Sequence, residues 1–158
     1  MQFTFRVDGE VKGKMRPKAT RMGGFTRVYT PKAQVQNENW IRLEYQRKAE
    51  KEKFPGFGEK PVKVEIYYYK RTPKGMPKKR KAEALATRLK PTTKQDLDNV
   101  VKTILDALNG IAYGDDSQVV EIRAYKNYAE TDHTDVSMTD DVYACVENIG
   151  EEDTELCL

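Results

Sequence analysis

The sequence predicts an α+β fold, a single domain in which two main helices cover a small mixed sheet. Its 158 residues suit one hydrophobic core. Apolar residues alternate along 2–7 and 61–69, as in strands, and recur at helical spacing along 96–110. The order strand, helix, strand, helix, strand, strand favours helices layered on one sheet. We expect the domain to span residues 1–148, with an acidic tail over 149–158.

The first predicted helix begins at Thr30 and Pro31, with Thr30 as its N-cap and Pro31 at the first helical position. The Glu, Gln, Lys and Arg content favours a helix as far as about Lys51. The sequence Phe-Pro-Gly-Phe-Gly at 54–58 is expected to break it. The alternating stretch at 61–69 then predicts the second strand.

The predicted helix at 96–110 has the clearest amphipathic pattern in the chain, and Asn109-Gly110 is expected to end it. Its apolar face consists of Leu97, Val100, Val101, Ile104, Leu105 and Leu108. Residues 113–116 then predict a tight turn. The stretches 118–128 and 136–147 both have the composition of strands, which completes the predicted sheet.

Two stretches are predicted to be exposed connections. Residues 9–30 are rich in Gly, Lys and Arg, with 22–24 expected at a loop tip and 27–29 as a short extended piece. Residues 71–94 contain Pro, Gly and a Lys/Arg cluster, and only 82–89 are compatible with one or two helical turns. Helix and strand are therefore expected mainly outside these two stretches.

The net charge of +3 conceals a strong asymmetry. Residues 12–32 hold seven Lys or Arg and no acid, and residues 70–94 hold ten, opposed only by Glu83. Beyond Lys126 there is no Lys or Arg, but there are ten acidic residues. Two basic blocks and an acidic end indicate a polyanionic partner that contacts part of the surface.

The composition excludes several classes of site and location. His133 is the only histidine, and Cys145 and Cys157 are the only cysteines, so a two-His metal site, a zinc ribbon and a disulfide framework are not expected. No apolar run approaches the ~18 residues that cross a bilayer. The N-terminus has no apolar signal core. We therefore expect a cytoplasmic protein with no membrane partner.

Aspartates and one lysine form the most informative pattern. Asp96 stands at the mouth of a predicted helix, Asp98 lies in its first turn, and Lys102 follows Asp98 by one turn on the same face. The short turn after the helix carries Asp115 and Asp116 and is compatible with their return toward the helix. Converging carboxylates without His or Cys form a hard oxygen site, which prefers Mg²⁺ or Mn²⁺. Such an ion activates water and stabilises charge at phosphate, and a nearby lysine assists.

Each of these residues also has an ordinary structural interpretation. Asp96 fits a helix cap, and the helix dipole favours Asp98 in any case. The pair Asp115-Asp116 after a glycine fits a turn, and Lys102 fits a surface ion pair with Asp98. Spacing alone favours these ordinary roles over catalysis.

The chain resembles the RusA family of Holliday junction resolvases, which are found in phages and prophages. The resemblance is specific over residues 94–122, and the basic openings at 14–18 and 27–32 support it. The residues that carry it are Asp96-Leu-Asp-Asn99, Lys102, Leu105-Asp-Ala-Leu-Asn-Gly110 and Asp115-Asp-Ser-Gln-Val119. It implies a homodimeric nuclease that makes paired symmetrical nicks in four-way DNA junctions and uses Mg²⁺ or Mn²⁺.

The resemblance also implies roles for individual residues. Asp96, Asp98 and Asp116 match the family's essential carboxylates and are the expected metal ligands. Asp115 is expected as a further ligand or a helper, and Lys102 matches the family's functional lysine. The chain departs from the family pattern directly before the first aspartate, where some members carry Arg and this sequence has glutamine.

The basic blocks are then expected to contact DNA phosphates, which gives affinity with little sequence readout. For residues 74–81, a solubilising loop is an equally favoured interpretation. Two other functions stay open: a nuclease for other branched or flapped DNA, and a nucleic-acid-binding module without catalysis. The expected DNA contacts are Lys12, Lys14, Arg16, Lys18, Arg21, Arg27, Lys78, Lys79, Arg80 and Lys94.

Overall fold

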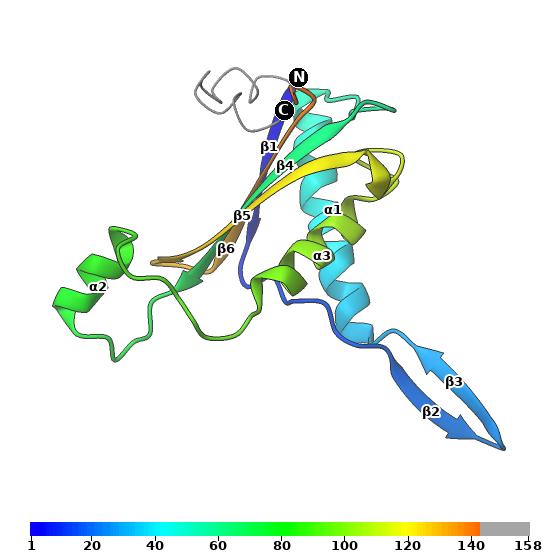
Figure 1. The fold of residues 1–158 in the computed structure, drawn as a ribbon, viewed down its shortest axis with the longest axis horizontal. Helices are drawn as coiled ribbons and strands as arrows, with labels where there is room; N and C mark the ends of the chain where they lie inside the picture. The colour runs from blue at the N-terminus through cyan, green and yellow to red at the C-terminus, as the bar shows by residue number, and fades with distance from the viewer. Residues whose placement is uncertain (143–158) are drawn as a thin grey trace, which may run out of the picture.

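The computed structural model describes residues 1–142 (Figure 1). A four-stranded sheet runs through its centre in the order β1-β6-β4-β5. Strands β4 and β5 are parallel, whereas β6 is antiparallel to both of its neighbours, so the predicted mixed sheet is confirmed. The strands of this sheet are β1 (Gln2–Asp8), β4 (Val62–Arg71), β5 (Val119–Ala129) and β6 (His133–Thr139).

Two helices, α1 (Lys32–Glu52) and α3 (Leu97–Leu108), cover one face of this sheet and pack against each other. The alternation predicted for β1 is present, because Phe3, Phe5 and Val7 are buried and their neighbours are exposed. These side chains meet the buried faces of both helices in a single core. The predicted α+β domain is therefore confirmed, and the clearest amphipathic segment of the sequence lies at its centre.

The segments between these elements contain more structure than the sequence predicted. A hairpin of β2 (Lys18–Met22) and β3 (Phe25–Tyr29) extends from the body, with its turn at the expected tip (Figure 1). In the second connection a helix, α2 (Lys78–Leu85), forms earlier in the chain than expected. It buries Ala84 and packs beside β5, and this tertiary contact decides its position.

Two predicted boundaries are wrong. Helix α1 begins at Lys32, with Pro31 in extended conformation as its N-cap, and Thr30 makes no cap hydrogen bond. The last strand ends at Thr139, and the next residue, Asp140, pairs with Lys60 and with the N-terminal ammonium. The later part of the strand expected over 136–147 and the tail at 149–158 lie outside the described residues. Within residues 1–142, no helix combines the length and apolar character that a bilayer crossing requires.

Candidate active site

The N-terminal end of α3 carries the first group of predicted site residues. Val100 and Ile104 are fully buried and fix the helix on the core. Asp96 is the N-cap residue by position, yet its side chain makes no capping hydrogen bond. Asp98 is exposed in the first turn, and its carboxylate lies 3.8 Å from the ammonium nitrogen of the exposed Lys102. Asp96 therefore faces solvent without the capping role that spacing favoured, whereas Asp98 forms the exposed ion pair with Lys102 that spacing favoured.

Two lysines of the sheet support the loop that leads into Asp96. Lys126 of β5 donates hydrogen bonds to the main-chain oxygens of Gln95, at 2.6 Å, and of Thr93. Lys70 of β4 donates to the main-chain oxygen of Lys94. Burial lowers the pKa of Lys126, and the nearby charge of Lys70 lowers it further, whereas Asp96 acts in the opposite direction. The position of Asp96 is therefore set by ammonium groups from two neighbouring strands.

The basic N-terminal segment lies directly against this end of the helix. The Gly13 N–H donates to the side-chain oxygen of Gln95 at 3.0 Å, and the Lys14 N–H donates to the main-chain oxygen of Asn99 at 2.9 Å. A Cβ on Gly13 would lie only 2.9 Å from the Cβ of Asn99, so this close approach requires glycine. Gln95, where the sequence departs from the family pattern, thus holds the basic segment in place.

Two polar residues of α1 hold the other side of the same segment, and no pattern in the sequence indicated either of them. Gln34 is 1% exposed and accepts a hydrogen bond from the Met15 N–H at 3.1 Å. Asn37 donates to the main-chain oxygen of Lys12 at 2.8 Å and accepts from its N–H at 3.3 Å. Both act on main-chain atoms more than fifteen positions away, which no local pattern predicts.

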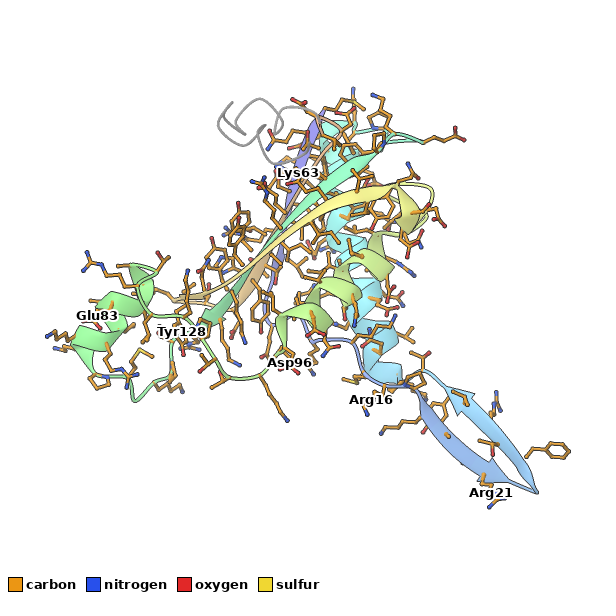
Figure 2. The ribbon with its side chains drawn as sticks, in the orientation of Figure 1. Arg16, Arg21, Lys63, Glu83, Asp96 and Tyr128 are labelled. Carbon is orange, nitrogen blue, oxygen red and sulfur yellow. The ribbon has the colours of Figure 1, made fainter. Side chains whose placement is uncertain are left out.

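These contacts create a groove of about 460 Å³ beside the start of α3. One wall is basic and comes from the N-terminal segment, and the other carries the carboxylate and ammonium of α3. Its lining residues are Lys14, Met15, Arg16, Pro17, Asp98, Asn99 and Lys102. Figure 2 shows Arg16 and Asp96 on this side of the molecule, next to the base of the hairpin. The groove joins cations suited to phosphate with the exposed carboxylate of Asp98, which is suited to a metal ion.

The second group of predicted site residues follows the other end of α3. Asp115 caps a short 3₁₀ turn and accepts a hydrogen bond from the Ser117 N–H at 2.9 Å. A hydrogen bond from the Ser117 side chain, and then the one from its N–H, lower the pKa of the Asp115 carboxyl. The side-chain oxygen of Gln118 accepts from the Asp115 N–H at 3.0 Å. Its amide nitrogen donates to the main-chain oxygens of Gly58 and Lys60, in the loop before β4, each at 2.8 Å. The turn is thus firmly held, and Asp116 is exposed on it.

The two groups of aspartates do not meet within one chain. The turn after α3 folds onto the last turns of the helix, because the Tyr113 hydroxyl donates to the main-chain oxygen of Leu105 at 3.1 Å. The twelve residues of α3 span about 18 Å at 1.5 Å per residue. Within residues 1–142, no three His, Cys, Asp or Glu side chains gather closely enough to hold a metal ion. The sequence left open whether Asp115 and Asp116 return to Asp96 and Asp98, and within residues 1–142 of a single chain these side chains form no such cluster.

The predicted DNA contacts lie on both sides of the start of α3 (Figure 1). The N-terminal members line the groove or continue onto the hairpin, and the later members lie on α2 and in the loop before α3. Figure 1 shows α2 and the hairpin extending on either side of the start of α3. The basic residues thus flank Asp96 and Asp98. Their contact with DNA stays a prediction.

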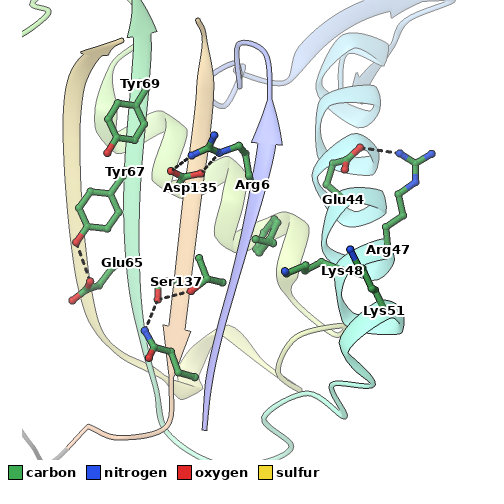
Figure 3. Close-up of a pocket in the computed structure, with 13 residues that line it drawn as sticks. Arg6, Glu44, Arg47, Lys48, Lys51, Glu65, Tyr67, Tyr69, Asp135 and Ser137 are labelled. Atoms are coloured by element: carbon green, nitrogen blue, oxygen red, sulfur yellow. Dashed lines mark hydrogen bonds and ion pairs between the residues drawn. The ribbon is translucent and has the colours of Figure 1, made fainter. Parts of the chain in front are cut away.

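A larger hollow of about 840 Å³ lies elsewhere, between the uncovered face of the sheet and α1 (Figure 3). Its charges are largely paired with each other. Arg6 donates to both carboxylate oxygens of Asp135, at 2.6 and 2.8 Å, and Tyr67 donates to Glu65 at 3.1 Å. This hollow contains none of the predicted site residues, so the smaller groove is the better candidate for the active site.

Comparison with known proteins agrees with this assignment. Residues 8–139 match the family described as Endodeoxyribonuclease RusA. The chain is also 33% identical over 134 residues to YqaN of Bacillus subtilis (strain 168), an uncharacterized protein, and this match covers 84% of the present chain and 92% of YqaN. The resemblance seen in the sequence is confirmed. The chain belongs to the RusA endodeoxyribonuclease family.

Proposed function

We propose that this protein is a structure-selective DNA endonuclease that resolves four-way junctions by paired, Mg²⁺- or Mn²⁺-dependent hydrolysis of phosphodiester bonds. The groove beside α3 carries the proposal, because it combines exposed Asp98 and Lys102 with the cations Lys14 and Arg16. Membership of a family of endodeoxyribonucleases supports it. A neutral or acidic groove at this position would have favoured a different substrate.

The side chains at the groove suit a hard divalent cation. Mg²⁺ retains several waters and is commonly bound by one or two carboxylates together with substrate phosphate. Asp96, the N-cap residue of α3, and Asp98, in the first turn of this helix, provide two exposed carboxylates at the same helix end. When bound, the ion supplies Lewis-acid stabilisation of charge on the phosphate and lowers the pKa of a bound water. Lys102 would neutralise charge on the phosphate oxygens.

Paired cuts require two such sites, so we propose a homodimer. A two-fold axis that crosses α3 near its middle places the end of one helix opposite the start of its partner. Asp116 of the partner subunit would then join Asp96 and Asp98, and the aspartates separated along one chain would complete a single site. Asp115, whose carboxylate already accepts the Ser117 N–H, would hold this turn rather than act as a principal ligand.

An apolar surface beside α3 supports this mode of association. Val120 and Ile122 of the edge strand β5 are 56% and 46% exposed. Ile122 pairs with the buried Val64 and so lies on the face of the sheet that the helices cover. Helix α3 contacts β5, and its Val101 and Leu105 are only partly buried. Apolar side chains at the border of a helix and an open strand edge are suited to self-association.

The proposal is tested with a panel of synthetic DNA substrates incubated with Mg²⁺, with Mn²⁺ or with EDTA. The panel contains a four-way junction, a flap, a Y-fork and a linear duplex of matched sequence. We expect wild-type protein to cut the junction fastest, at symmetrical positions in two opposed strands, and only with metal. Asp98→Asn should bind the junction and fail to cut it.

Other outcomes distinguish the alternatives. Faster cutting of the flap or fork identifies a nuclease for other branched DNA. Binding without cutting in any metal, together with a flat Mn²⁺ titration by calorimetry, identifies a binding module. Equal cutting by wild type and Asp98→Asn contradicts the assigned site.

A further inference from the structure

The hairpin of β2 and β3 extends away from the body as an arm (Figure 1). Its turn is formed by Gly23 and Gly24, with φ of 58° and 86°, the left-handed conformation that favours a tight two-residue hairpin turn. All five residues of β3 are exposed. An isolated two-stranded hairpin is at best marginally stable in water. An arm of this kind is therefore suited to a ligand that packs against it.

One face of the arm combines cations with aromatic rings. Residues directly opposite in an antiparallel pair share a face. The register pairs Lys18 with Tyr29, Thr20 with Arg27 and residue 22 with Phe25, so these positions share one face. Phe25 at the tip is 84% exposed and Tyr29 near the base is 44% exposed. Arg27 lies between the two rings along the strand.

The charge of the arm and its place in the chain point to nucleic acid. The sequence from residue 12 to residue 32 contains no acid, so the arm has no internal partner for its cations. It begins at Lys18, directly after Pro17 of the groove wall. DNA in the groove would therefore continue onto the arm. A second copy of this net-positive chain would offer poorer charge complementarity to the same surface.

We propose that the arm binds DNA and that Phe25 stacks on an unpaired or unstacked base at the branch point. This inference rests on the proposed function. Cations along the strands contact phosphates whatever the DNA shape. The phenyl ring has no hydrogen-bonding group, so its contribution is stacking. In linear duplex both faces of every internal base are already stacked, and insertion must first separate them. A branch point offers exposed base faces, so Phe25 adds affinity there and the arm selects branched over linear DNA.

The test measures binding of a four-way junction and of a matched linear duplex by fluorescence anisotropy in EDTA. We expect Phe25→Ala to weaken junction binding by about tenfold, within the range for loss of one stacked base, and to leave duplex binding nearly unchanged. Phe25→Trp should retain the preference. Val28→Ala, which removes an apolar side chain that is 65% exposed on the other face of the arm, is the matched control and should have no effect.

A direct signal comes from 2-aminopurine placed at the branch point. Stacking by Phe25 should change its fluorescence with wild-type protein and with Val28→Ala, but not with Phe25→Ala. Equal weakening of junction and duplex binding by Phe25→Ala, or no weakening of either, overturns the proposal. If sedimentation velocity shows that Phe25→Ala has a different oligomeric state from wild type, the proposal is also overturned, because the arm would then contact a second copy of the chain.

The inference about the arm and the proposed nuclease function can be contradicted independently of each other. If wild type cuts junctions while Phe25→Ala keeps the full junction preference, the inference about the arm is wrong and the proposed function stands. If the 2-aminopurine signal depends on Phe25 while no substrate is cut in any metal, the arm is supported and the proposed function is wrong.

Discussion

Lys126 donates a hydrogen bond to the main-chain oxygen of Gln95 at 2.6 Å and so supports the residue that directly precedes Asp96. Its nitrogen also reaches the main-chain oxygen of Thr93. A strand at the edge of the sheet thereby fixes the loop that presents a proposed metal ligand. The lysine is a positioning residue, because it acts on Asp96 through the main chain.

Replacement of this lysine is expected to affect cutting more than binding. Lys126→Met keeps most of the side-chain volume and removes the donor, so the loop before Asp96 loses its support. We expect the rate of junction cutting under saturating protein to fall by roughly ten- to a hundredfold, as for other residues that orient metal ligands. Junction affinity should change by much less. Lys48→Met on α1 removes a surface lysine far from the groove and serves as the control; an equal fall in both variants contradicts the positioning role.

Gln34 is expected to contribute to stability as well as to the groove. Its side chain is buried and accepts the Met15 N–H, so Gln34→Ala leaves a main-chain donor without its partner. Loss of such a partner costs about 1–3 kcal/mol, measured as the free energy of unfolding in urea. Gln36→Ala, at an exposed position of the same helix, should cost little. Equal losses in the two variants would show that the groove wall does not depend on Gln34.

The ion pairs of Asp140 predict a pH-dependent part of stability. The hydrogen bond from Lys60, and then that from the N-terminal ammonium, lower the pKa of Asp140 to about 2. In the unfolded chain the pKa of an aspartate has its ordinary value of about 3.9. The folded form therefore gains stability from this group above about pH 4 and loses it as pH falls toward 2.

The corresponding experiment compares thermal unfolding of wild type and Asp140→Asn from pH 6 to pH 2. We expect the variant to melt at lower temperature at pH 6 and the difference to shrink as the pH is lowered. Asp141→Asn, at an exposed neighbouring position, controls for the loss of a charge. A difference that stays constant across this pH range would rule out the ion pairs as its cause.

Mixed dimers test whether each active site contains metal ligands from two chains. Asp98→Asn and Asp116→Asn should each be inactive alone. If Asp116 of the partner subunit completes the site, a mixed dimer of the two variants carries both substitutions in one site and leaves the other site intact. We therefore expect mixing to restore a nick in a single strand. No recovery after confirmed subunit exchange would place all the ligands of a site on one chain.

The sequence predicted the elements whose burial follows a local period. The alternation in β1 and β4 and the apolar face of α3 each reflect contact with one core, so periodicity located them. Strand β2 was missed because its residues 18–21 are all exposed, so burial imposes no alternation on them. Helix α2 was placed too late because its position depends on packing beside β5 rather than on its own composition.

The candidate site likewise contains residues that the sequence indicated and one whose location depends on how the chain folds. The residue types at Asp96, Asp98 and Lys102 were compatible with phosphate chemistry, and the resemblance to the RusA family favoured that role over caps and a surface ion pair. The location of Asp116 relative to them depends on how the turn after α3 folds, and the hydrogen bond from Tyr113 to Leu105 decides that. A side-chain to main-chain hydrogen bond of this kind leaves no periodic trace in the sequence.

The rate of junction cutting in Mg²⁺, compared between wild type and Asp98→Asn under single-turnover conditions, bears on the whole proposal. Products resolved to single nucleotides show whether the cuts are paired. We predict symmetrical nicks in opposed strands with wild type, none in EDTA, and none with Asp98→Asn at unchanged junction affinity. Cutting that is independent of metal, or equally fast in the variant, would contradict a metal-dependent nuclease centred on this groove.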